Sequence, residues 1–251
     1  MKKILTLILP LSLVLWGFNE DTNTVKHLKS ASDNPPAVVV ELFTSQGCSS
    51  CPAADRLLSQ LKESAQPVIP LSFHVSYWNY LGWTDPFSKE AFSKRQRTYA
   101  RNLRSSVYTP QMVFNGSSEC VGSSKPQVEQ NIKQALKIKP SNKVELAVVQ
   151  RGSSLEVKYQ IEGTLENRAL QIALVESMIS VDVKRGENRG RTLSHDNVVR
   201  HFKTIPLHRG AEGKYQVQIP ENFKMERGSV VAYVQQNTSL RVTGANQVNL
   251  N

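Results

Sequence analysis

A nearly continuous apolar run, Ala37 to Phe43 (AVVVELF), is followed closely by a segment with helical spacing. The run is short and rich in valine, which is typical of a strand covered on both faces in a parallel sheet. Apolar residues then recur at helical intervals from Ala54 to Leu61, and Pro52 suits a first helical turn because its missing N–H breaks no bond there. Val68 to Val75 predicts the next strand. This order predicts a β-α-β unit with a parallel sheet and therefore an α/β fold.

The pattern changes at Pro140. Before it, a polar helix (Phe87 to Leu103), a hairpin around Asn115-Gly116 and an amphipathic helix (Pro126 to Ile138) complete the α/β part, residues 37–139. After it, helical spacing stops and runs with strand-like alternation predict an all-β immunoglobulin-like sandwich at residues 141–251. The expected strands are Lys143 to Gln150, Leu155 to Glu162, Leu170 to Met178, Val198 to Ile205, Lys214 to Ile219, Val230 to Gln236 and one near Leu240 to Leu250.

The N-terminus predicts export. Lys2 and Lys3 precede an apolar run, Ile4 to Leu15, that is too short to span a bilayer core of ~30 Å comfortably. We expect a signal peptide at residues 1–18, with an uncertain cleavage site, and a polar linker at 19–36; a retained N-terminal anchor is the alternative. The expected location is therefore the periplasm or the exterior. Nucleic acid is an unexpected partner for an exported chain, although the formal net charge is +10.

Three cysteines in 251 residues do not make a disulfide scaffold, but two of them form the C-x-x-C motif Cys48-Ser-Ser-Cys51. The motif lies between a predicted buried strand and a helix, where residues three apart face the same side and can be bridged. The helix N-terminus favours a thiolate, so Cys48 is the expected nucleophile and Cys51 the resolving thiol. Two alternatives stay open: an inert structural disulfide, and a metal half-site with His74 as a third ligand.

Two further segments are candidates for substrate binding. The loop after the second strand is unusually aromatic, and its side chains Tyr77, Trp78 and Trp83 either wall a substrate groove or fill the core. Thr109 and Pro110 precede an extended run, where a cis proline would turn the backbone of Thr109 toward an extended substrate.

Several motifs together resemble an exported bacterial family of thioredoxin-like proteins whose function is largely uncharacterised. The motifs are VVELFTSQGCSSCPAADRLL, FHVSYWNYLGWTDPF, RQRTYA, VYTPQMVFNG and VKRGENRGRTLSHDNVV. The resemblance implies a thioredoxin-like domain at residues 37–139, with Cys48 and Cys51 as the dithiol pair and Pro110 as the cis-proline. Thioredoxins also carry a buried acid near the position of Glu41, which relays protons to the resolving cysteine; an ion pair with a basic side chain is the alternative for Glu41.

A basic loop in the second half, Lys184 to Arg191 (KRGENRGR), either binds an anion, docks on the first half or lies in solvent. We predict that Arg189 or Arg191 contacts the first half, with Asp85 in the aromatic loop as the favoured acceptor. The expected function is thiol–disulfide exchange with exported proteins that carry disulfides or thiols, without a cofactor. A binding or scaffold protein with a structural bridge, and a copper- or zinc-handling protein, are the alternatives.

Overall fold

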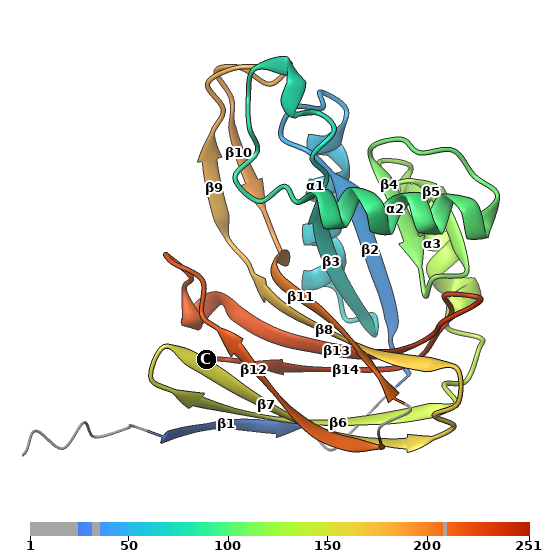
Figure 1. Cartoon of the computed structure of the whole chain (residues 1–251). Coiled ribbons are helices and arrows are strands. Elements are labelled where there is room, and N and C mark those ends of the chain that lie inside the picture. Colours follow the sequence, from blue (N-terminus) through green and yellow to red (C-terminus); the bar gives the residue numbers. More distant parts are fainter. Residues whose placement is uncertain (1–24, 32–35, 208–209) are drawn as a thin grey trace, which may run out of the picture.

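The computed structural model describes residues 25–31, 36–207 and 210–251, and the expected signal peptide lies outside them. The helices and strands before residue 140 form an α/β part that packs on two layers of strands formed mainly by the rest of the chain (Figure 1). Part of the expected linker forms strand β1 (Val25–Ala31), which pairs antiparallel with β6 (Asn142–Arg151). This pairing uses backbone hydrogen bonds, which a polar segment makes as readily as an apolar one.

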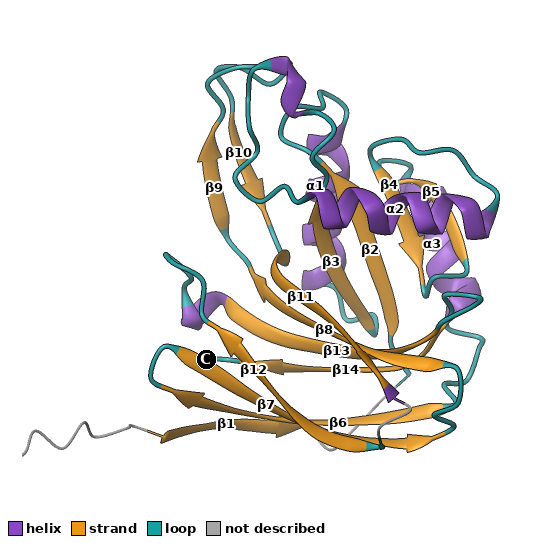
Figure 2. Cartoon of the chain, in the orientation of Figure 1, coloured by secondary structure: helices purple, strands orange, loops and turns teal. Residues whose placement is uncertain are grey.

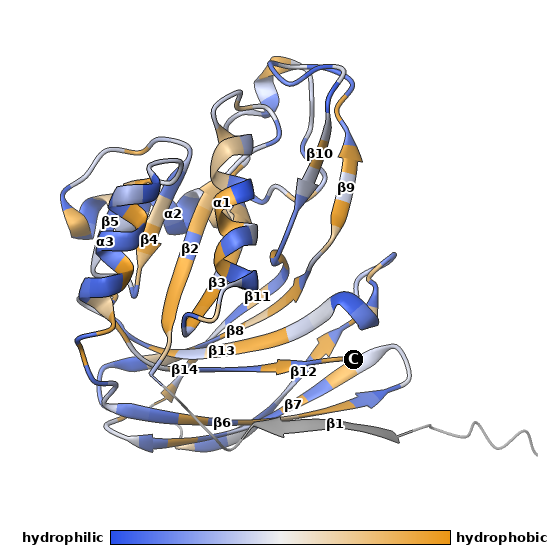
Figure 3. Ribbon diagram, turned by 180° about the vertical axis from the view of Figure 1, so that it is seen from behind, coloured by the Kyte–Doolittle hydropathy of each residue, from blue (hydrophilic) through white to orange (hydrophobic). Residues whose placement is uncertain are grey.

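The predicted β-α-β unit is confirmed. Strand β2 (Val38–Thr44) runs parallel to β3 (Val68–His74) and antiparallel to β4 (Gln111–Phe114), which pairs with β5 (Ser118–Val121). Both β2 and β3 are strongly hydrophobic (Figure 3), as strands covered on both faces must be. The helices α1 (Cys51–Glu63) and α3 (Lys125–Ala135) pack on one face of this sheet, and α2 (Glu90–Leu103) packs on the other.

Beyond residue 140 the chain is almost entirely strand (Figure 2). Each of the seven expected strands is present within a few residues of its predicted bounds. Beside β6 they are β7 (Ser154–Gly163), β8 (Arg168–Glu176), β11 (Val198–Pro206), β12 (Glu212–Gln218), β13 (Gly228–Gln236) and β14 (Val242–Asn249). A further hairpin, β9 (Ile179–Asp182) and β10 (Thr192–His195), was not expected from the sequence.

The expected separate immunoglobulin-like domain is not seen. One eight-stranded mixed sheet runs through both halves in the order β14-β13-β8-β11-β3-β2-β4-β5, and a four-stranded sheet, β1-β6-β7-β12, packs against part of it. Strand β11 joins β3 where Ser72 N–H donates to the carbonyl of Asn197 at 2.8 Å, and the Asn197 amide donates to the carbonyl of Pro70 at 2.7 Å. Strand periodicity predicts each strand but not its neighbours, so this continuity was invisible in the sequence.

The core under α2 belongs to both halves for the same reason. Phe43, Phe73 and Phe92 from the α/β half pack there with Val175 and Tyr233 from the second half. The fold is therefore mixed α/β with a central mixed sheet and smaller antiparallel sheets. The domain boundary that the sequence predicts near residue 140 stays a prediction. No helix in the described part of the chain is both long and apolar enough to cross a membrane.

Candidate functional site around the Cys48–Cys51 disulfide

Cys48 and Cys51 form a disulfide at the start of α1, with their Cα atoms 5.4 Å apart. The backbone N–H of Cys51 donates to the carbonyl of Cys48 at 3.2 Å, which closes a tight turn. Ser49 and Ser50 are exposed, but Cys48 is only 1% exposed and Cys51 is fully buried. The cysteine pair thus lies at the helix start, where the motif predicts it, but both cysteines are buried.

The Thr109–Pro110 peptide bond is cis, as the resemblance implies. Trp78 links this turn to the cysteine turn: its indole N–H donates to Thr109 Oγ1 at 2.7 Å, and its Cβ lies 3.2 Å from where a Cβ on Gly47 would stand. Gly47 immediately precedes Cys48, and a side chain at this position would crowd Trp78. Trp78 therefore holds the cis-proline turn and the disulfide turn against each other.

The other two aromatic candidates, Trp83 and Tyr77, lie in different surroundings, and the groove role stays a prediction. Trp83 contacts the cysteine turn, because its indole N–H donates to Gln46 Oε1 at 2.9 Å. Tyr77 packs against the core under α2, which is the core-filling role.

Glu41 is not placed to relay protons to Cys51. Its carboxylate accepts two hydrogen bonds from Arg95, from Nε at 2.6 Å and from Nη2 at 2.7 Å, and one each from the hydroxyls of Tyr99 and Tyr233. Side chains alternate along a strand, so Glu41 faces α2 while its neighbours in β2 face α1. Of the two interpretations of Glu41, the structure shows the ion pair.

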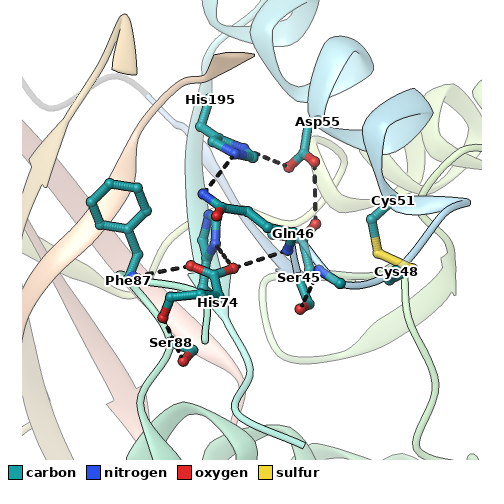
Figure 4. Close-up of polar contacts among 12 residues, drawn as sticks. Ser45, Gln46, Cys48, Cys51, Asp55, His74, Phe87, Ser88 and His195 are labelled. Carbon is teal, nitrogen blue, oxygen red and sulfur yellow. Dashed lines mark hydrogen bonds and ion pairs between the residues drawn. A yellow bond between two sulfur atoms is a disulfide. The ribbon is translucent and has the colours of Figure 1, made fainter. Parts of the chain in front are cut away.

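A cluster of buried ionisable side chains lies next to the disulfide (Figure 4). His74 Nδ1 is 2.7 Å from Asp85 Oδ2, and the backbone N–H of Gln46 donates to the same oxygen at 2.9 Å. The His195 ring meets the His74 ring edge to face, with centroids 4.8 Å apart. His195 Nδ1 lies 3.7 Å from Asp55 Oδ1.

The sequence does contain a signal for Asp55: it follows Cys51 by four residues, on the same face of α1. His195 lies in the motif VKRGENRGRTLSHDNVV, but nothing in that motif indicates that the fold brings β10 beside α1.

His74 and Asp85 form a charged pair. Burial by itself lowers the pKa of His74, but attraction and a hydrogen bond to Asp85 outweigh it and raise that pKa above 6.5. Burial likewise raises the pKa of Asp85, and His74 together with the backbone N–H groups of Gln46 and Phe87 brings it below 3.8. His74 Nδ1 is thus occupied by its hydrogen bond to Asp85. Among the described residues no group of three or more His, Cys, Asp or Glu side chains is arranged to hold a metal ion, the alternative set Cys48, Cys51 and His74 included.

The loop between β9 and β10, residues 183–191, docks on the backbone of the cysteine turn. The Asn188 side-chain amide, fully buried, donates to the carbonyls of Gln46 at 3.0 Å and Cys48 at 2.9 Å. Glu187 Oε2 accepts the backbone N–H of Ser49 at 2.9 Å, and this bond lowers the pKa of the Glu187 carboxyl. The basic loop therefore docks on the first half, which was one of its predicted roles.

The docking does not use the predicted contact with Asp85; Arg191 instead donates to Asn188 Oδ1 at 3.1 Å and so holds the amide that docks. Arg189 and Arg191 are exposed, and the described residues show no contact between either guanidinium and Asp85, whose carboxylate is occupied by His74 and two backbone N–H groups. The loop turns through Gly186 and Gly190, both with a φ of 78°. This turn aims the neutral amide of Asn188 inward, where burying a guanidinium without a charged partner would be costly.

The fold and the site define a thioredoxin-like protein with a C-x-x-C disulfide at a helix start. The chain belongs to the family described as "Protein of unknown function (DUF1223)", whose model matches residues 39–235. Protein AGR_C_4864 from Agrobacterium tumefaciens has a similar structure, with a TM-score of 0.66 and 27% identity over 88% of this chain and 97% of that one. HBP35 of Porphyromonas gingivalis shares the fold at 13% identity, with a TM-score of 0.61 over 87% of this chain and 76% of that one. Among curated proteins, none matches this chain.

Proposed function

We propose that the protein is an exported thiol–disulfide oxidoreductase that acts on other exported proteins through Cys48 and Cys51. The observation that carries the proposal is the disulfide at the N-terminus of α1, held by Trp78 against the cis Thr109–Pro110 turn. A merely structural bridge needs neither a helix start nor a neighbouring cis-proline turn.

The oxidised form reacts with a protein dithiol. One substrate thiolate attacks Cys48 Sγ, the Cys48–Cys51 bond breaks, and Cys51 leaves with the electron pair and takes up a proton. The second substrate thiolate then attacks the substrate sulfur of the mixed disulfide and expels the Cys48 thiolate. The substrate is oxidised by two electrons and the protein reduced by two; run in reverse with a disulfide substrate, the same steps restore the bridge.

Two features favour Cys48 as the sulfur that carries the mixed disulfide. It lies against the unpaired N–H groups at the start of α1, whose first turn holds no acidic residue, so its thiolate is stabilised. The Ser50 hydroxyl lies 3.4 Å from Cys48 Sγ and can donate to the thiolate. The backbone of Thr109, before the cis Pro110, would pair with an extended substrate; the Pro110 carbonyl already accepts the N–H of Gly122. Trp78 bonds Thr109, and Trp83 bonds Gln46 beside the cysteine turn.

Trapping tests the proposal. Cys51→Ser removes the resolving thiol, so mixed disulfides between Cys48 and exported proteins should accumulate in cells, and Cys48→Ser should abolish them. A glutathione titration of the purified protein gives the reduction potential. Absence of trapped species together with a bridge that glutathione cannot reduce would contradict exchange.

The burial of both cysteines favours a second candidate, a binding or scaffold protein with a structural disulfide. The two candidates differ in what happens when residues 183–191 move. An exchange protein should become reducible, whereas a structural bridge should keep a low potential whatever the position of the loop.

Export is part of the proposal and rests on Lys2, Lys3 and the apolar run that follows. The N-terminus of protein recovered from the periplasm or medium is expected to begin between residues 17 and 23. A full-length chain retained in the cytoplasm would contradict export but not exchange.

A further inference from the structure

We infer that His195, carried by β10 from the second half of the chain, positions Asp55 as the group that exchanges a proton with Cys51. The inference rests on the proposed function and deepens it. Asp55 and Cys51 are both buried on α1, one helical turn apart, and Figure 4 shows Asp55 on the side of the disulfide toward His195.

The hydrogen-bond network determines which His195 nitrogen carries the proton. The Trp83 indole can only donate, so the Gln46 atom 2.9 Å from it is the amide oxygen and the other amide atom is the NH₂ group. That NH₂ group lies 3.3 Å from His195 Nε2, which must therefore accept. In the neutral ring the proton then resides on Nδ1, facing Asp55.

The two atoms that face each other both lack a hydrogen-bond partner. Asp55 Oδ1 and His195 Nδ1 are buried and unpartnered, and they lie 3.7 Å apart, beyond hydrogen-bond distance. The other Asp55 oxygen is held by the Thr44 hydroxyl at 3.3 Å. A small shift closes an Nδ1–H to Oδ1 bond, which fixes the carboxylate at both oxygens.

The chemistry of exchange requires a proton acceptor at this place. When the bridge re-forms, the Cys51 S–H bond breaks, its proton passes to the Asp55 carboxylate, and the Cys51 thiolate attacks Cys48 Sγ and expels the substrate thiolate. Asp55 returns the proton to water when the site opens. In the opposite direction the protonated Asp55 neutralises the Cys51 thiolate as the bridge breaks. Glu41 faces α2 and is bound to Arg95, so it cannot accept the proton of Cys51.

The remaining ionisable groups near the pair are already engaged. His74 and Asp85 neutralise each other within hydrogen-bond distance; His74 Nε2 has no hydrogen-bond partner among the described residues, and Asp55 also attracts the His74 ring. Asp196, which follows His195, binds Lys62 at 2.9 Å. Asp55 is thus the buried carboxylate near Cys51 with an oxygen still available.

Stopped-flow reaction of the reduced protein with one equivalent of 5,5′-dithiobis(2-nitrobenzoate) separates the two sulfur steps. Cys120→Ala is used throughout, so that only the motif thiols react. Attack by Cys48 releases the first thionitrobenzoate, and attack by Cys51 on the mixed disulfide releases the second. A group that acts on the Cys51 proton slows only the second phase.

Asp55→Asn should slow the second phase by about 100-fold, in the range usual for a lost acid–base group, and His195→Gln by about 10-fold. The double variant should be no slower than Asp55→Asn alone, because His195 acts through Asp55. His195→Asn, whose amide stands where Nδ1 stood, should restore most of the rate. The second phase in heavy water should slow in the wild type and not in Asp55→Asn.

His201→Gln is the matched control. This half-buried histidine on β11 bonds Tyr215 at 2.8 Å, away from the disulfide, and its replacement should change neither phase. A second phase unchanged in His195→Gln, or slowed equally in His195→Gln and His195→Asn, overturns the inference alone. A wild type that releases no thionitrobenzoate overturns the proposed function itself.

Discussion

Replacing Asn188 by alanine should expose the Cys48–Cys51 bridge to reductants without unfolding the protein. The side-chain amide of Asn188 donates to the buried carbonyls of Gln46 and Cys48 at 3.0 and 2.9 Å. The substitution removes both bonds, and while the loop stays closed it leaves the Gln46 carbonyl without a replacement, whereas the Cys48 carbonyl keeps the N–H of Cys51. It acts where residues 183–191 dock on the cysteine turn.

The size of the effect follows from these two bonds. Each contributes about 1 kcal/mol net, and stranding the Gln46 carbonyl adds to the loss, so loop docking should weaken by about 2–3 kcal/mol. Because 1.4 kcal/mol corresponds to a factor of ten, the open population should rise by about 30- to 150-fold. If opening is fast compared with attack, the rate of reduction should rise by the same factor.

The assay is reduction of the oxidised protein by dithiothreitol, with timed acid quench, alkylation and mass measurement. Asn142→Ala is the matched control, since Asn142 is also a buried asparagine that donates to two carbonyls, Glu162 at 3.0 Å and Thr164 at 2.8 Å, but within the sandwich. It should lower the free energy of unfolding without changing the reduction rate. Equal rates in Asn188→Ala and the wild type, or equal acceleration by both variants, would refute the argument.

Three further predictions concern stability and thiol reactivity. Glu41→Ala strands the charge of Arg95 and should lower the free energy of unfolding by about 3–5 kcal/mol in urea titrations; a loss below about 1 kcal/mol would contradict a tightly coupled pair. Because the pKa of His74 is raised in the folded state, the contribution of His74 to stability is complete below pH 6.5 and is lost as the pH rises through its folded-state pKa. Because the pKa of Asp85 is lowered, the contribution of Asp85 is complete above pH 3.8 and is lost as the pH falls through its folded-state pKa. The wild type should therefore lose stability as the pH rises above 6.5 and through the folded-state pKa of His74, and His74→Gln should lose less over that range. Burial raises the pKa of Cys120 to about 11, so roughly one molecule in a thousand is thiolate there at pH 8 and iodoacetamide should leave native Cys120 unlabelled.

The sequence alone determined the local elements and the cysteine pair. Strand and helix periodicity report which face of each segment is buried, and a C-x-x-C motif between a strand and a helix start can be bridged wherever the rest of the chain lies. The seven strands after residue 140 and the two cysteines at the start of α1 were therefore predictable.

Only the tertiary structure decided what surrounds the disulfide. Asn188 lies 140 residues after Cys48, and His195 lies 144 residues after Cys51. Both lie near the disulfide because β11 pairs with β3, which brings the β9–β10 hairpin beside α1. The pairing of distant strands depends on which backbone edges are free and which side chains share a core, and no periodicity in a single chain records either. For the same reason Glu41 appeared in the sequence as a proton relay, while its place in β2 turns it to Arg95 and leaves Asp55 beside Cys51.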